Sequence, residues 1–284
     1  MLVYLNGRFV PEEQAMVSVF DRSFLYGDGL FETMLVANGQ IFRWELHADR
    51  LMAGADFLKI KLPESPAQLS KAVGELIRAN GIFDGVLRLT LSRGTGVRGY
   101  SPRQATSPFV VMTLHTADGN ASGTLVDWHL RTSSFKLPAA EPVSQYKTCN
   151  KLAQVLARAE AEQLGADEAL LLNTDGFVVE AASANLFWVV REKVFTPPLA
   201  AGVLSGVTRR VVLELCCRLG LEVSESNIAA TELSQADGVF LSLSTLGIVQ
   251  GASLDGVDLR VSPVTERLRS RYFELVQQET AVRE

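Results

Sequence analysis

Two Asn-Gly pairs near the N-terminus each separate two short apolar runs, and they constrain the fold more than any other local feature. Asn6-Gly7 separates residues 3–5 from 8–10, and Asn38-Gly39 separates residues 31–37 from 40–43. Asn and Gly both tolerate positive φ, which a type I′ hairpin turn requires. The sequence therefore predicts that the chain begins with antiparallel β-sheet.

Further helical and strand-like segments follow in an irregular order. Apolar residues at spacings of three and four predict helices over 44–58, 65–80, 150–164, 208–219 and 264–278. Short apolar or β-branched runs predict strands over 85–91, 108–115, 124–130, 168–172, 177–180, 185–190 and 238–243. Residues 132–146 have the composition of a loop. Because strands and helices do not alternate regularly, the predicted fold class is α+β and not a doubly wound parallel sheet.

One linker-like stretch, Gly119-Asn120-Ala121-Ser122-Gly123, interrupts this pattern. Domains typically contain about 100–200 residues, and the chain has 284. We therefore expect an N-terminal α+β domain over residues 1–118, a linker over 119–123 and a C-terminal domain over 124–284.

The composition excludes several classes of protein. Hydrophobic residues make up 47% of the chain, and the net charge is −5, which argues against disorder and against a basic nucleic-acid-binding face. No apolar run of about 18 residues indicates a membrane span, and no leader peptide is recognisable. The three histidines lack metal-ligand spacing, and the three cysteines indicate free thiols. We expect a cytoplasmic enzyme without a metal site.

Three features could carry chemistry, and each has a structural alternative. Lys147 precedes an amphipathic helix and is either a solvated surface residue or a Schiff-base lysine. Glu180 lies in an apolar run, where it either meets a cross-strand partner or faces a cationic ring nitrogen. Residues 204–209 form a Gly-containing turn into a helix, which is either a simple cap or an anion site.

Taken together, these features resemble the class IV aminotransferase family, the fold-type IV enzymes that use pyridoxal 5′-phosphate (PLP). The resemblance runs from about residue 5 to about residue 249. It implies a small N-terminal α/β sandwich domain, a larger C-terminal pseudo-barrel domain and a homodimer. The matching motifs, in chain order, are residues 21–33, residues 47–51, Lys147 with Asn150, Glu180 with Asn185, and residues 206–209.

The resemblance also assigns roles to individual residues. Lys147 would form the Schiff base with PLP and act as general acid–base, and Glu180 would pair with the protonated ring nitrogen so that the ring acts as an electron sink. A guanidinium can bind a phosphate through two parallel hydrogen bonds. The residues that would hold the phosphate are Arg50, Val207, Thr208 and Ser244.

The motifs indicate less clearly which enzyme within this family the sequence resembles. Residues 91–101 resemble the corresponding run of 4-amino-4-deoxychorismate lyases, which release pyruvate and p-aminobenzoate, so our main expectation is such a lyase of folate biosynthesis. Arg98 would then hold the carboxylate of a small amino substrate, although Arg93 and Arg98 could also lie in a solvated hairpin loop.

An aminotransferase of amino-acid metabolism is the alternative function. Tyr26 is similar to the branched-chain transaminases, whereas Phe31 replaces the tyrosine of D-amino-acid transaminases. These two residues would contribute to the substrate site. A PLP-binding protein without activity is a third hypothesis, against which the presence of Lys147 and Glu180 argues. Cys149 either packs at a helix start or lies near the cofactor, and we favour packing.

Overall fold

The structure is a computed structural model that describes residues 1–116 and 126–281, and its contacts divide the chain into two compact units. Unit 1 comprises Met1–Ala121, Tyr146–Lys151 and Val276–Glu284, and unit 2 comprises Ser122–Gln145 and Leu152–Leu275, each as far as it is described. The predicted linker 119–123 lies outside the described residues, so the proposed boundaries stay a prediction. The sequence did not predict that residues 146–151, which include Lys147, belong to unit 1.

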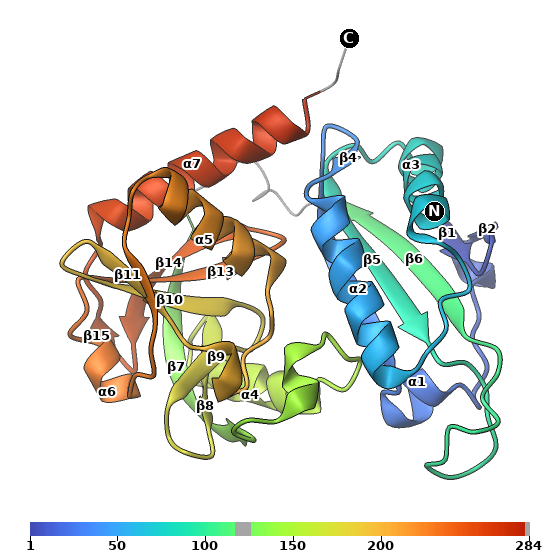
Figure 1. The fold of residues 1–284 in the computed structure, drawn as a ribbon, viewed down its shortest axis with the longest axis horizontal. Coiled ribbons are helices and arrows are strands. Elements are labelled where there is room, and N and C mark those ends of the chain that lie inside the picture. The colour runs from blue at the N-terminus through green and yellow to red at the C-terminus, as the bar shows by residue number, and fades with distance from the viewer. Residues whose placement is uncertain (117–125, 282–284) are drawn as a thin grey trace. The chain divides into compact units, whose positions relative to one another are not determined.

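Unit 1 contains a six-stranded antiparallel sheet with the order β2-β1-β6-β5-β3-β4 (Figure 1). Both predicted hairpins are confirmed, because Leu5 pairs with Arg8 and Ala37 pairs with Gln40 across turns of positive φ. The strands are β1 (Leu2–Leu5), β2 (Arg8–Pro11), β3 (Gly29–Ala37), β4 (Gln40–Ile41), β5 (Gly85–Ser92) and β6 (Phe109–Thr116).

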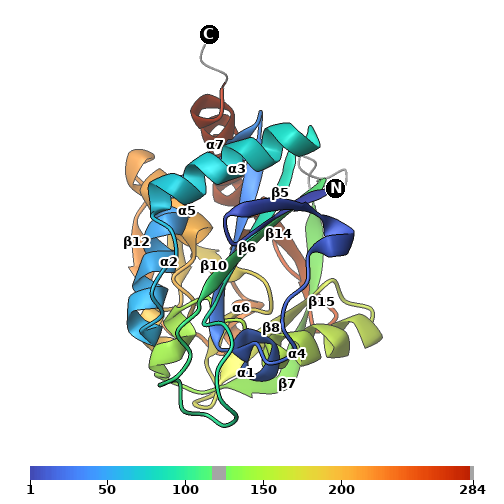
Figure 2. The ribbon, with the colours of Figure 1, turned by 90° about the vertical axis from the view of Figure 1, so that its right-hand side faces the viewer.

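Two long helices, α2 (Trp44–Leu58) and α3 (Pro66–Asn80), pack with this sheet around one buried core (Figures 1 and 2). Ser65 caps α3 in a capping box with Gln68, which explains why the helix begins there. A short helix, α1 (Arg22–Tyr26), precedes β3, and a 3₁₀ turn, η1 (Glu12–Gln14), follows β2. Asp21 caps α1, and Gly27 ends it in the left-handed conformation.

Unit 2 contains a nine-stranded sheet in which six strands close into a barrel. The order β10-β13-β14-β7-β8-β9 returns to its start because Asn185 of β10 also pairs with Glu180 of β9. The predicted α+β fold with a C-terminal pseudo-barrel is therefore confirmed. The strands are β7 (Asp127–Leu137), β8 (Glu168–Asn173), β9 (Val178–Ala181), β10 (Asn185–Val190), β11 (Lys193–Thr196), β12 (Val223–Glu225), β13 (Gly238–Leu243), β14 (Gly247–Leu254) and β15 (Val257–Asp258).

Helices cover parts of this barrel. The helix α4 contacts β7 and β8, whereas α5 contacts β12 and β13. None of the helices in the described parts of the chain is long and apolar enough to cross a membrane. The remaining elements are α4 (Leu152–Gln163), α5 (Val207–Arg218), α6 (Ala230–Leu233), α7 (Pro263–Glu279), η2 (Pro142–Gln145) and η3 (Leu199–Ala201).

The prediction of a loop over 132–146 is wrong for residues 132–137, because β7 continues to Leu137. This half of the strand contains two serines and a lysine, so it lacks an apolar pattern. Two carboxylates bind polar groups of this half instead: Glu160 accepts hydrogen bonds from the Ser133 hydroxyl and the Ser134 amide, and Asp255 accepts from the Thr132 amide and hydroxyl. A register shift between Thr132 and Lys136 further disturbs the alternation of side chains.

Candidate active site

Lys147 is held beside the first half of β3 by strand-like pairing. The amide of Phe31 donates to the Lys147 carbonyl at 2.9 Å, and the amide of Cys149 donates to the Gly29 carbonyl at 2.9 Å. The Lys147 side chain is half-buried, and its Nζ lies 4.5 Å from the centre of the Phe31 ring. The structure therefore places the predicted Schiff-base amine against an aromatic hydrocarbon surface in unit 1.

Arg50 lies in a buried charged cluster in the same unit. Its Nε and Nη2 donate to the two carboxylate oxygens of Glu32 at 2.8 and 2.6 Å, and the His47 ring nitrogen Nδ1 donates to Glu32 at 2.6 Å. Burial acts to raise the pKa of Glu32, but the charge of Arg50 and the hydrogen bonds from Arg50 and His47 outweigh it and lower this pKa to about 2. Glu32 is therefore ionised and fixes the orientation of the Arg50 guanidinium.

Phe31 also contacts a cation that the sequence did not single out. The Arg88 guanidinium lies 4.0 Å from the centre of the Phe31 ring. Close by, burial raises the pKa of the Cys149 thiol. A thiol with a raised pKa is protonated near neutral pH and is a poor nucleophile, which agrees with the packing role that we favour for Cys149.

Arg98 and Tyr26 are connected through the loop between β5 and β6. Arg98 is exposed on this loop, and the Tyr26 hydroxyl accepts a hydrogen bond from the neighbouring Gly99 amide at 3.4 Å. Arg93 begins the same segment, but it is buried and its Nε lies 2.7 Å from Asp28. The alternative of a solvated loop is therefore wrong for Arg93.

Glu180 is buried at the point where β9 meets β10 in unit 2. Its Oε2 accepts a hydrogen bond from the Leu204 amide at 3.0 Å and a longer one from Asn185 Nδ2 at 3.4 Å. Asn185 Nδ2 also donates to the Leu204 carbonyl at 3.0 Å. The carboxylate is thus fixed by two donors, and Asn185 ties it to the turn that precedes α5.

That turn leads directly into the N-terminus of α5. A Cβ built at Gly206 would overlap Oδ1 of Asn185, so only glycine allows the chain to pass so close. Val207 and Thr208 follow in the first turn, where backbone amides lack intrahelical acceptors and can bind an anion. Ser244 lies on the turn between β13 and β14. These positions fit a phosphate site.

Two residues that matter here were missed from the sequence. Glu32 is a carboxylate inside the apolar strand β3, which is the same signal that singled out Glu180. His47 falls within a family signature but had no assigned role. Arg209 of the 206–209 motif is structural, because it is buried and Nη2 lies 2.6 Å from Glu225.

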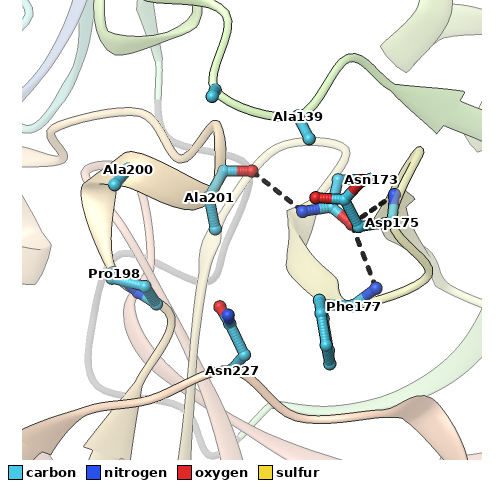
Figure 3. A pocket seen from close by; sticks show the side chains of 9 residues that line it. Ala139, Asn173, Asp175, Phe177, Pro198, Ala200, Ala201 and Asn227 are labelled. Atoms are coloured by element: carbon cyan, nitrogen blue, oxygen red, sulfur yellow. Dashed lines mark hydrogen bonds between the residues drawn. The ribbon is translucent and has the colours of Figure 1, made fainter.

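Unit 2 also contains a small cavity of about 150 Å³ that includes none of the predicted site residues (Figure 3). Hydrogen bonds of the Asn173 side chain connect the residues that line the cavity. Nδ2 donates to the Ala201 carbonyl at 3.2 Å, and Oδ1 accepts from the Asp175 and Phe177 amides. The lining residues are Ala139, Ala140, Asn173, Asp175, Phe177, Pro198, Ala200, Ala201 and Asn227.

Comparisons with known proteins show the family of this chain. The family model for amino-transferase class IV matches residues 29–254. A Methanocaldococcus jannaschii protein, whose name assigns it provisionally as a branched-chain-amino-acid aminotransferase, is 34% identical over 97% of this chain and 96% of its own length. The aminodeoxychorismate lyase of Vibrio harveyi is 33% identical over 90% of this chain and 95% of its own.

A solved structure extends the similarity to the whole fold. The branched-chain amino acid aminotransferase from T.th., solved with pyridoxamine 5′-phosphate, has a TM-score of 0.91 at 30% identity. The similarity covers 98% of this chain and 94% of that chain. The half-buried amine of Lys147, the fixed carboxylate of Glu180 and the glycine-dependent turn before α5 fit such a cofactor. This chain belongs to the class IV aminotransferase family and is a PLP-dependent enzyme.

Proposed function

We propose that this enzyme is an aminotransferase of the branched-chain type, which transfers the amino group of an aliphatic amino acid to a 2-oxo acid. The observation that carries the proposal is the contact between Phe31 and Lys147, with Nζ 4.5 Å from the ring centre. A ring without a hydroxyl beside the reactive amine suits an aliphatic substrate side chain, which gains free energy from apolar burial.

Two further observations support this proposal over the lyase function. Tyr26 is similar to the branched-chain subgroup, to which two of the relatives described above also belong by name, and Phe31 departs from the D-amino-acid transaminases. In addition, Arg93 of the lyase-like segment is engaged with Asp28 and with the carbonyls that end α2. The Arg93 part of the resemblance between residues 91–101 and the lyases therefore reflects contacts that stabilise the fold of unit 1. It carries no information about the substrate.

A lyase remains the second candidate, because the Vibrio harveyi relative is a lyase and matches at nearly the same identity. The two functions share the same cofactor and the same lysine, and they differ in the leaving group of the substrate. Only the reaction products separate them. A lyase releases pyruvate and p-aminobenzoate from aminodeoxychorismate, whereas an aminotransferase produces a new amino acid and a new 2-oxo acid.

The residues of each unit have distinct roles in the proposed reaction. When bound, PLP supplies an electron-accepting ring that stabilises negative charge on the amine-bearing carbon of the substrate. Nζ of Lys147 would remove the proton from that carbon. Glu180 would keep the ring nitrogen protonated, as a carboxylate fixed by the Leu204 amide can do.

The phosphate would be bound by charge and by backbone amides. Arg50 offers a guanidinium oriented by Glu32, and Val207 and Thr208 offer the first amides of α5. Ser244 adds a hydroxyl from the turn after β13. The substrate carboxylate would pair with Arg98, because an exposed arginine loses little on binding a carboxylate through two hydrogen bonds.

We also propose a homodimer. Residues 16–25 expose a group of large apolar side chains that a monomer in water rarely leaves uncovered. A second copy of the chain, covering this segment, would bury them. The exposed apolar residues are Met16, Val17, Val19, Phe20, Phe24 and Leu25.

The three free cysteines are consistent with the cytoplasmic location predicted from the sequence.

A substrate panel tests the proposed function. The PLP-loaded protein is offered L-leucine, L-valine or D-alanine with 2-oxoglutarate, and separately aminodeoxychorismate. We expect glutamate to form with the two branched-chain L-amino acids and p-aminobenzoate to stay at background. Formation of p-aminobenzoate without amino-acid turnover would establish the lyase instead. Light scattering at micromolar concentration tests the homodimer, and the mass of a monomer would exclude it.

A further inference from the structure

Arg22 of α1 holds the loop that carries Arg98. Its side chain is buried, with 4% of its surface exposed. Nη1 donates to the Gly99 carbonyl at 2.9 Å and to the Ser101 carbonyl at 3.3 Å, and Nη2 donates to the Tyr100 carbonyl at 2.9 Å. One guanidinium therefore binds three consecutive carbonyls, directly after the residue that we assign to the substrate carboxylate.

The guanidinium of Arg22 is itself held in place by the Asp28 carboxylate. Its Nε donates to Asp28 Oδ2 at 2.8 Å, and the same oxygen accepts from Arg93 Nε at 2.7 Å. Arg93 in turn donates to the Leu58 carbonyl at 2.8 Å, at the end of α2. The loop is thereby connected through two arginines and one carboxylate to the rigid core of unit 1.

The negative charge of Asp28 strengthens its hydrogen bonds to the two arginines. Burial acts to raise the pKa of Asp28, but hydrogen bonds and charges from Arg93 and Arg22 lower it overall. Asp28 is thus ionised, and it pairs with both buried guanidinium groups. Hydrogen bonds that involve a charged group are stronger than neutral ones, so this arrangement fixes the Arg22 side chain in one orientation.

Aromatic contacts hold the loop from a second direction. The Tyr26 hydroxyl accepts a hydrogen bond from the Gly99 amide, and the rings of Tyr26 and Tyr100 meet edge to face at 5.6 Å. The Arg22 guanidinium also lies 5.0 Å from the centre of the Tyr26 ring. Gly99 is therefore bound at both its amide and its carbonyl, directly beside Arg98.

We propose that Arg22 is a positioning residue that sets the place of Arg98 and so determines the affinity of the enzyme for carboxylate substrates. The inference rests on the proposed role of Arg98 in binding that carboxylate. A planar group with five donors is needed, because a lysine ammonium cannot reach Asp28 and three separate carbonyls in one fixed geometry.

The test compares Arg22→Lys with Arg98→Gln, Tyr26→Phe and a matched control, Arg43→Gln. Arg43 forms a partly buried ion pair with Glu279 at 2.8 Å in unit 1, so its loss reproduces a similar structural defect away from the loop. Each variant is loaded with PLP, and its KM and kcat for L-leucine are measured. Calorimetry measures the Kd of 4-methylvaleric acid, a branched carboxylic acid without an amine.

We expect Arg22→Lys and Arg98→Gln each to raise KM and this Kd by about tenfold, the effect of losing charged hydrogen bonds. The kcat of Arg22→Lys should stay within about twofold of wild type, and Tyr26→Phe should show a smaller rise in KM. Arg43→Gln should keep the wild-type KM. PLP absorbance should show equal loading in all variants.

A readout without turnover separates positioning from a general structural role. Hydrogen exchange of the peptide around residues 97–101 should be faster in Arg22→Lys and unchanged in Arg43→Gln. If Arg22→Lys keeps the wild-type KM and Kd while Arg98→Gln raises both, the inference about Arg22 is wrong and the role of Arg98 stands. If Arg98→Gln also leaves both unchanged, the role of Arg98 fails, and this inference fails with it.

Discussion

Arg50 and Glu32 form a buried ion pair, in which Nη2 of the arginine lies 2.6 Å from Oε2 of the glutamate. His47 contacts the same carboxylate, so one ionised group orients two side chains of α2. If Arg50 binds the cofactor phosphate, Glu32 acts on that phosphate indirectly, through the direction in which it holds the guanidinium.

Replacement of Glu32 by glutamine tests this pair. The variant removes the negative charge that lies against the largely buried Arg50 guanidinium, so we expect the free energy of unfolding to fall by about 3 kcal/mol. The affinity for PLP should fall as well. Urea unfolding and a PLP titration measure the two effects. Lys71→Gln, which removes an exposed pair with Glu75, should unfold like wild type, and equal stability of the two variants would contradict the account.

The pH dependence of stability should report His47. Burial lowers its pKa below the usual 6.5, and the positive charge of Arg50 adds to this, against the opposing effect of Glu32. The folded protein therefore keeps His47 neutral where the unfolded chain binds a proton. Its contribution to stability is complete above about pH 6.5 and is lost as the pH falls towards the lower folded pKa.

Thermal unfolding at pH 7.5 and pH 5.5 measures this contribution. Wild type should lose stability on acidification, and His47→Gln should lose less over the same interval. His115→Gln, which changes an exposed histidine, is the control and should follow wild type. An equal loss in wild type and His47→Gln would show that His47 does not bind a proton on unfolding.

Replacement of Gly206 by alanine tests whether the turn before α5 binds the cofactor phosphate. An added methyl would overlap Asn185, which also contacts Glu180, so we expect Gly206→Ala to cost about 1–3 kcal/mol of stability and to weaken PLP binding. The change Gly74→Ala in the helix α3 is the control, since its nearest neighbour is the flexible end of Arg78. A Gly206→Ala protein with the PLP affinity of wild type would exclude a phosphate site at this turn.

Glu180→Gln isolates the charge of the carboxylate. Glutamine keeps an acceptor for the Leu204 amide but cannot hold the cofactor nitrogen protonated, so we expect kcat to fall on the order of a hundredfold with little change in stability. Steady-state kinetics and thermal unfolding measure both quantities. The exposed change Glu222→Gln should leave kcat unaltered, and an active Glu180→Gln enzyme would refute the assigned role.

The sequence predicted those elements whose side chains repeat regularly. The helix over 44–58 and the strands over 185–190 and 238–243 have the predicted bounds. The strand β14 was missed because Gly247, Gln250 and Gly251 interrupt its apolar pattern. In the fold, Gln250 is buried and donates to the Val239 carbonyl, a long-range contact that no local pattern reveals.

The residues of the candidate site could likewise be predicted from the sequence only in part. Lys147 and Glu180 could be singled out because a lysine before a helix and a carboxylate in an apolar run are unusual. The pairing of Arg50 with Glu32, and the binding of residues 99–101 by Arg22, join positions 18 and about 78 residues apart. Such contacts depend on which strands become neighbours, and local periodicity does not determine that.

The most direct test of the central claim follows the α-hydrogen of L-leucine in the absence of any 2-oxo acid. Enzyme loaded with PLP is incubated with L-leucine deuterated at the α-carbon, and release of the label into water is measured. We expect release by wild type and none by Lys147→Ala, while D-alanine keeps its label. Release by Lys147→Ala at the wild-type rate, or release from D-alanine alone, would contradict this expectation.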